Sequence, residues 1–137
     1  METGLHSAFA ILPTMLLNFA TMIVMLAISV TIYMFITPYR EVKLIRAGNT
    51  AAAVTLSGAM VGLALPLAFC MASSTYYADI AIWGVVALSL QLITYLIAGL
   101  LLKGVRRRVE NNEIGPSILL ATLMVTVGII NAASLAG

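Results

Sequence analysis

The sequence predicts an all-α integral membrane protein with four transmembrane helices, arranged as two tandem helical hairpins. Hydrophobic residues make up 62% of the 137 residues and charged residues only 9%, whereas soluble domains contain about 25% charged residues. Several apolar stretches reach the roughly 20 residues that a helix needs to cross a bilayer. A soluble core cannot explain four such stretches, because too little polar surface would remain to cover them.

The positions of the basic residues predict the orientation in the membrane. All seven lie in two short loops: Arg40, Lys43 and Arg46 in the first, and Lys103, Arg106, Arg107 and Arg108 in the second. Because positively charged loops stay in the cytoplasm, we expect both hairpin turns inside and both termini outside. The first 39 residues contain no Lys or Arg, so a cleaved signal peptide is not expected.

The first helix is expected from about Thr14 to Ile36, after a short outer segment of residues 1–13. Pro13 suits the first turn of a helix, and the Thr37-Pro38 pair suits its end, because the residue before proline disfavours helix. The loop at 38–48 alternates cations with aliphatic residues, which is typical of a segment lying on the membrane surface.

The second helix is expected from about Thr50 to Cys70, capped by the side-chain oxygen of Asn49 or Thr50. Gly58 and Gly62 form a small-xxx-small face that permits close helix packing. The face is available either to the fourth helix or to another subunit.

Pro66 lies inside this second helix and cannot donate a hydrogen bond to the carbonyl of Gly62. That carbonyl is therefore available to a neighbouring Ser or Thr hydroxyl, to water, or to a cation. A proline kink satisfied by a hydroxyl is the simpler of these interpretations.

An outer loop is expected at 72–79, followed by a third helix at about 80–102 and a fourth that ends near Leu135, with Pro116 in its first turn. The layout of the first hairpin recurs 64 positions later: Thr122 and Thr126 follow Gly58 and Gly62 at that distance. We therefore expect one membrane domain with repeat halves at approximately 14–71 and 78–135.

Three deep polar residues, Asn18, Gln91 and Asn131, are expected inside the membrane. Such side chains most often form hydrogen bonds between helices. The alternative is that Asn18 and Gln91 line a conducting path together with Thr122 and Thr126.

Several motifs resemble the YjfL family of small bacterial inner-membrane proteins, known as domain of unknown function 350. They are Ile36-Thr37-Pro38, Gly48-Asn49-Thr50-Ala51-Ala52-Ala53, Ser57-Gly58, Trp83-Gly84, Gln91-Leu92 and Asn131-Ala132-Ala133. The Gly-Asn-Thr-Ala-Ala-Ala run is the most specific of them. The resemblance implies a four-helix inner-membrane protein of two tandem hairpins, and it implies no catalytic residues, because the family has no established activity.

The residue types that are missing exclude several functions. No Asp, Glu, Lys, Arg or His falls inside the four expected helices, although proton relays and ion-coupled carriers usually contain them. One His and one Cys cannot supply haem ligand pairs, a thiol pair or a metal cluster. No base accompanies the loop serines. We therefore expect no enzyme, no cofactor and no metal.

Two function classes remain open. In the first, the protein is a homo-oligomeric membrane adaptor whose basic turns bind anionic lipid headgroups or a cytoplasmic peripheral protein. Helix N-termini near Thr50 and Gly115 would add unpaired amide protons to those cations. In the second, it is an oligomeric pore or carrier for a small solute. Nucleic acid is not expected, because each cationic cluster lies at a helix end beside the membrane.

Overall fold

A computed structural model describes residues 2–37, 41–73 and 77–136 of the chain. These residues form four long helices, α1 (Glu2–Ile36), α3 (Thr50–Ser73), α4 (Tyr77–Leu102) and α6 (Ile114–Ala136). Two short helices, α2 (Glu41–Arg46) and α5 (Val105–Glu110), form the basic turns. The four long helices are all apolar and long enough to span a membrane, so the predicted all-α membrane fold is confirmed.

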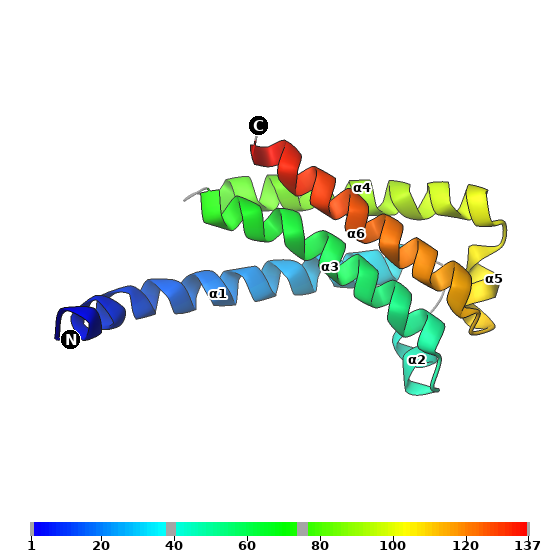
Figure 1. Ribbon diagram of the computed structural model, residues 1–137, viewed down its shortest axis with the longest axis horizontal. Helices are drawn as coiled ribbons and strands as arrows, with labels where there is room; N and C mark the ends of the chain where they lie inside the picture. The colour runs from blue at the N-terminus through cyan, green and yellow to red at the C-terminus, as the bar shows by residue number, and fades with distance from the viewer. Residues whose placement is uncertain (1, 38–40, 74–76, 137) are drawn as a thin grey trace.

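The helices α3, α4 and α6 form the packed body of the molecule (Figure 1). The most extensive packing is between α3 and α6, and α4 contacts both. The short helices α2 and α5 lie at one end of this body, and both chain termini point toward the other end (Figure 1). The basic residues that the structure describes are therefore gathered at a single end of the bundle.

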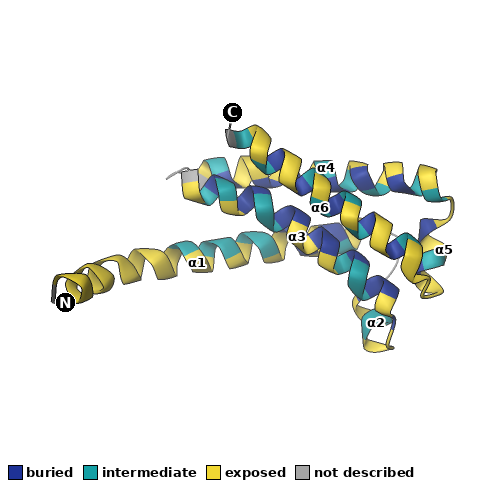
Figure 2. Ribbon diagram, in the orientation of Figure 1, coloured by how far each residue is buried: buried dark blue, intermediate teal, exposed yellow. Residues whose placement is uncertain are grey.

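The start of α1 differs from the sequence-based prediction. The helix begins at Glu2 and contains Pro13 in its interior, whereas we expected residues 1–13 to precede it. Proline removes only the hydrogen bond to the carbonyl four residues earlier, and the residues around it can continue the helix. The N-terminal half of α1 extends away from the other helices and is exposed on all sides (Figure 2).

Other boundaries also differ in detail. Residues 72–73 and 77–79, expected in an outer loop, belong to the ends of α3 and α4. The rest of that loop, 74–76, lies outside the described residues. The first basic loop contains a helical turn, with Leu44 and Ile45 packed against the core. Pro116 lies in the first turn of α6, as predicted.

The core is built around Tyr33 of α1, Leu63 of α3, and Leu120 and Met124 of α6, each fully buried. Alanines of α4 pack against it, and Val105 and Val109 anchor α5 to the same cluster. A smaller cluster of Leu67, Cys70 and Ile80 lies toward the opposite end.

Glycine permits the close approach of α3 and α6. A methyl group built on Gly58 would lie 2.5 Å from the Cα atom of Ala121, and one built on Gly128 would lie 2.5 Å from the carbonyl oxygen of Gly62. No side chain fits at either position. The Gly58 and Gly62 face is thus used within one chain, against α6, rather than being open to another subunit.

Candidate functional site: the basic turns

The two basic turns end in the same backbone motif. After α2, the Gly48 and Asn49 amides donate to the Ile45 and Leu44 carbonyls at 3.0 and 2.9 Å. After α5, Asn112 and Glu113 repeat these bonds to Val109 and Arg108, at the same two distances. This is the Schellman ending, which needs a left-handed residue just past the helix.

Glycine and asparagine supply that left-handed residue. The φ angle is 91° at Gly48 and 59° at Asn112. Glycine adopts this conformation without a steric penalty, and asparagine tolerates it better than most residues. Each ending turns the chain sharply from a short surface helix into a long membrane helix.

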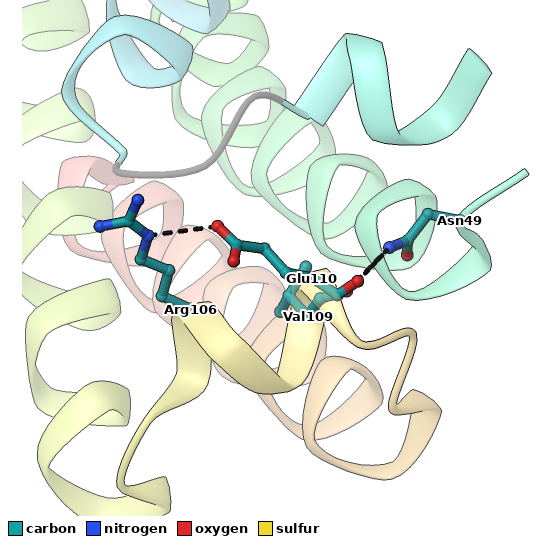
Figure 3. Close-up of polar contacts among 4 residues, drawn as sticks. All are labelled: Asn49, Arg106, Val109 and Glu110. Carbon is teal, nitrogen blue, oxygen red and sulfur yellow. Dashed lines mark hydrogen bonds and ion pairs between the residues drawn. The ribbon is translucent and has the colours of Figure 1, made fainter. Parts of the chain in front are cut away.

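Two asparagine side chains then join the turns to each other. The Nδ2 atom of Asn49 donates to the Val109 carbonyl at 2.9 Å (Figure 3). It also donates to the Glu110 carbonyl at 3.3 Å. In return, the Ala51 amide of α3 donates to Oδ1 of Asn112 at 2.9 Å. We call Asn49 and Asn112 with these bonds the asparagine clasp. It fixes α5 against the start of α3, although the two segments are about sixty residues apart in the chain.

Asn49 also caps α3, as the sequence predicts, because its Oδ1 accepts from the Ala52 amide at 2.8 Å. Two of the free amides at the start of α3 are therefore already hydrogen-bonded, one to each asparagine. This reduces the capacity of the helix end to bind an anion, which we expected near Thr50. The start of α6 is more open, since Ile114 and Gly115 are exposed.

Most of the described cations face solvent. Lys43 and Arg46 on α2, Lys103 before α5, and Arg106 and Arg107 on α5 are exposed, and Arg108 is half-buried. Arg40 lies outside the described residues. Arg106 forms an ion pair with Glu110 at 3.2 Å (Figure 3), and its charge is thereby partly neutralised.

The short helix α5 has one apolar and one cationic side. Val105 and Val109 are buried, whereas Arg106 and Arg107 are exposed. Apolar anchors beneath exposed arginines are typical of helices that lie at the membrane surface. The fold therefore buries the two valines of α5 and leaves Arg106 and Arg107 exposed.

The deep polar residues do not line one cavity in the described part of the chain. Gln91 is 1% exposed, and its Nε2 donates to the Met124 carbonyl at 2.9 Å. Asn131 is buried on α6, and Asn18 is half-buried on α1. The hydroxyls of Thr122 and Thr126 donate to carbonyls of their own helix. Gln91 thus bonds between helices, as the simpler interpretation predicted.

Thr122 and Thr126 line an exposed groove between α3 and α6 with a volume of about 490 Å³. Its α3 wall includes Ser57 and Gly58, and its α6 wall includes Ala121. The two threonines lie beside the contact between the helices and stay exposed.

Glu41 of the first basic loop is a residue for which the sequence alone predicted no role. In the structure Glu41 is 1% exposed, and the Thr37 hydroxyl donates to its Oε1 at 3.3 Å. The signal that could have identified Glu41 is an acid placed directly after a membrane helix, within an otherwise basic loop.

Asn112 was also missed, because an asparagine in a polar turn has no distinctive signature. Its role depends on the amide of Ala51, which only the folded chain brings near.

Comparisons with known proteins cover most of the chain. The family model described as Domain of Unknown Function (DUF350) matches residues 7–135. The chain is 31% identical over 111 residues to the UPF0719 inner membrane protein YjfL of Escherichia coli strain K12, covering 81% of this chain and 84% of that protein. The protein of the same name from Escherichia coli O157:H7 matches equally. No solved structure matches. The relatives are inner membrane proteins by name, and the four apolar helices agree with that location, so the chain belongs to the DUF350 family of inner-membrane proteins.

Proposed function

We propose that the protein is a non-enzymatic inner-membrane adaptor whose cytoplasmic end binds anionic lipid headgroups. The asparagine clasp is the observation that carries this proposal, because it joins the two basic turns into one platform. Exposed cations of both turns then act together on one surface. Basic residues near a membrane surface each contribute about 1 kcal/mol to binding anionic lipid.

The arginines on α5 favour a phosphate group over a diffuse anionic surface. Arg107 is exposed on one side of α5, and the buried Val109 on the other side holds the helix in place. A guanidinium group can bind two phosphate oxygens at once, whereas a lysine ammonium acts as a point charge. Phosphodiester headgroups of anionic lipids present this pair of oxygens.

The experiment compares charge removal with charge-conserving change on the purified protein. Anionic lipid retained after detergent extraction is quantified for the wild type, for Arg106, Arg107 and Arg108 all changed to Lys, and for the same three changed to Gln. We expect the Lys variant to retain less lipid and the Gln variant least, by about fivefold per neutralised cation in binding constant. Rising salt should weaken retention in the wild type.

A matched control changes Glu113 to Gln, since this exposed residue lies in the same turn and carries the opposite charge. This variant should retain as much anionic lipid as the wild type, or more. Equal lipid retention in all four proteins would contradict the proposal. If the Lys and Gln variants retain normal amounts of lipid but no longer bind an acidic cytoplasmic protein, the basic turns bind a protein partner instead.

We also propose that the chain is an internal repeat with halves near 14–71 and 78–135. The helices α2 and α5 begin 64 positions apart, as do α3 and α6. The left-handed residues Gly48 and Asn112 are separated by the same interval, and so are the hydrogen bonds around them.

We also propose that the adaptor forms homo-oligomers. The alternative to the adaptor function is a pore or carrier for a small solute. Since Asn18, Gln91, Thr122 and Thr126 do not share a cavity within the described chain, a pore would have to form between subunits. The groove that Thr122 and Thr126 line is the surface on which a second copy would pack. Thr122→Leu with Thr126→Leu should then lower the mass of the particle, and an unchanged mass would contradict assembly through this groove.

A further inference from the structure

The N-terminal part of α1 carries a regular stripe of large hydrophobic side chains. They recur along the helix at alternating steps of four and three residues, and each is exposed: Leu5, Phe9, Leu12, Leu16, Phe19 and Ile23. Between Thr3 and Thr14, the stripe contains every large hydrophobic residue except Ile11. We call these six residues the α1 stripe.

The α1 stripe continues an interface that already exists within the chain. The same spacing leads on to Leu26, Val30 and Tyr33, which pack in the hydrophobic core. Apolar residues at alternating steps of three and four are the pattern by which one helix packs along another. The C-terminal part of this repeat is covered within the chain, whereas the α1 stripe is left exposed.

The helix α1 is too long for lipid to cover the whole stripe. Its apolar segment, Thr3–Ile36, has 34 residues and therefore measures about 50 Å, whereas the hydrocarbon of a bilayer is about 30 Å thick. Met22 packs against the cluster that contains Cys70 and Ile80, and these two residues lie within one turn of the end of α3 and the start of α4. The residues before about position 18 therefore extend past the other helices, by about 20 Å at Leu5.

The N-terminal part of α1 does not lie flat on the membrane surface. A surface helix needs a bend where it leaves the transmembrane segment, but α1 is one continuous helix from Glu2 to Ile36. It runs on past the ends of α3 and α4 without a sharp bend (Figure 1). Leu5 and Phe9 are thus held beyond the hydrocarbon, where burial of apolar side chains away from water is favourable.

We propose that the α1 stripe packs along the same stripe of a second copy of the chain, as a parallel helix pair on the side of the membrane opposite the basic turns. Copies in one membrane share an orientation, because their basic turns stay on one side. Their α1 helices are then parallel, and each stripe residue meets its own counterpart. Residues 3–37 contain no Asp, Glu, Lys or Arg, so no charge pattern beside the stripe selects a different partner.

Disulfide crosslinking in isolated membranes tests this pairing. Single cysteines are introduced into a chain that carries Cys70→Ala, and they are oxidised with copper phenanthroline. The stripe variants are Leu5→Cys, Phe9→Cys, Leu12→Cys and Leu16→Cys, and the controls on the other faces of the helix are Ser7→Cys, Ala10→Cys, Ile11→Cys and Thr14→Cys.

We expect crosslinked dimers from the stripe variants and a loss of crosslinking in the controls, so that dimer formation follows the spacing of the stripe. No dimer from any stripe variant, or equal amounts from all variants, would overturn the proposal. Crosslinks to a protein of another mass would overturn it too, because the occupant would then be a different chain.

The proposal rests on the homo-oligomer proposed above, and crosslinking separates the α1 stripe from the groove between α3 and α6. If the purified protein is oligomeric by mass but no stripe variant crosslinks, the pairing of α1 is wrong and the groove contact stands. If the stripe variants crosslink while Thr122→Leu with Thr126→Leu leaves the particle mass unchanged, the groove contact is wrong and the pairing of α1 stands.

A matched pair of charge substitutions checks the register, with the Leu16→Cys crosslink as the readout. Phe9 and Ile11 are 69% and 63% exposed, so neither substitution removes a core contact of the single chain. Phe9→Glu places two like charges opposite each other in the helix pair and should reduce the crosslink, whereas Ile11→Glu should leave it unchanged. An equal effect of the two substitutions would contradict the pairing through the stripe.

Discussion

At the scale of single residues, the side chains of Asn49 and Asn112 form the hydrogen bonds that join the two basic turns. The side chain of Asn49 caps its own helix through Oδ1 and donates to the backbone of α5 through Nδ2. Asn112 combines a left-handed backbone with an oxygen that caps a helix from the other half of the chain. Few other residues combine tolerance of positive φ with a side-chain acceptor.

Substitution at Asn112 separates these two contributions. Asn112→Gly keeps the left-handed conformation and loses only the cap, which should cost about 1 kcal/mol of stability. Asn112→Ala loses the cap and also strains the backbone, so it should cost more. Thermal unfolding of the two purified variants measures the difference. Equal stability of both variants and the wild type would show that the clasp contributes nothing.

At the scale of elements, the contact between α3 and α6 determines the bundle. Apolar side chains in a membrane gain little by leaving lipid, so packing in close contact drives helix association. Glycines at the crossing allow backbone to lie against backbone, as at Gly128 and Gly62. The helix α1 lacks such a contact along its N-terminal half, and that half is correspondingly exposed.

Gly128→Ala tests this crossing. The added methyl group would meet the Gly62 backbone at 2.5 Å, and overpacking of this kind typically costs about 1–3 kcal/mol. We expect a lower unfolding temperature without a change in particle mass, because the contact lies within one chain.

Gly99→Ala is the matched control, since no atom lies within 4 Å of a methyl group there. Removing a helical glycine should leave stability unchanged or raise it by up to about 1 kcal/mol. If Gly128→Ala behaves like Gly99→Ala, the close crossing of α3 and α6 is not formed.

At the scale of the whole molecule, the arrangement puts both basic turns at one end and both termini at the other (Figure 1). The positive-inside rule then predicts cytoplasmic turns and external termini. Reporter fusions test this orientation: one that is active only in the cytoplasm should work at Lys103 and fail at Gly137. The reverse pattern would contradict the predicted orientation.

The number of membrane helices and the two basic turns between them were predictable from the sequence. These features are local, because a run of about 20 apolar residues matches the bilayer thickness wherever it occurs. The cap by Asn49 and the place of Pro116 were predictable for the same reason. The start of α1 was not, because Pro13 is compatible both with a first turn and with the interior of an exposed helix.

Only the tertiary structure decided which residues face one another. The helices are apolar on all sides, so no amphipathic stripe identifies the buried face. The contacts of Gly58 with Ala121, of Gln91 with Met124 and of Asn112 with Ala51 link positions far apart in the chain. They depend on the rotation and crossing of packed helices, which the local pattern does not specify. The burial of Glu41, in a loop expected on the membrane surface, follows from the same packing.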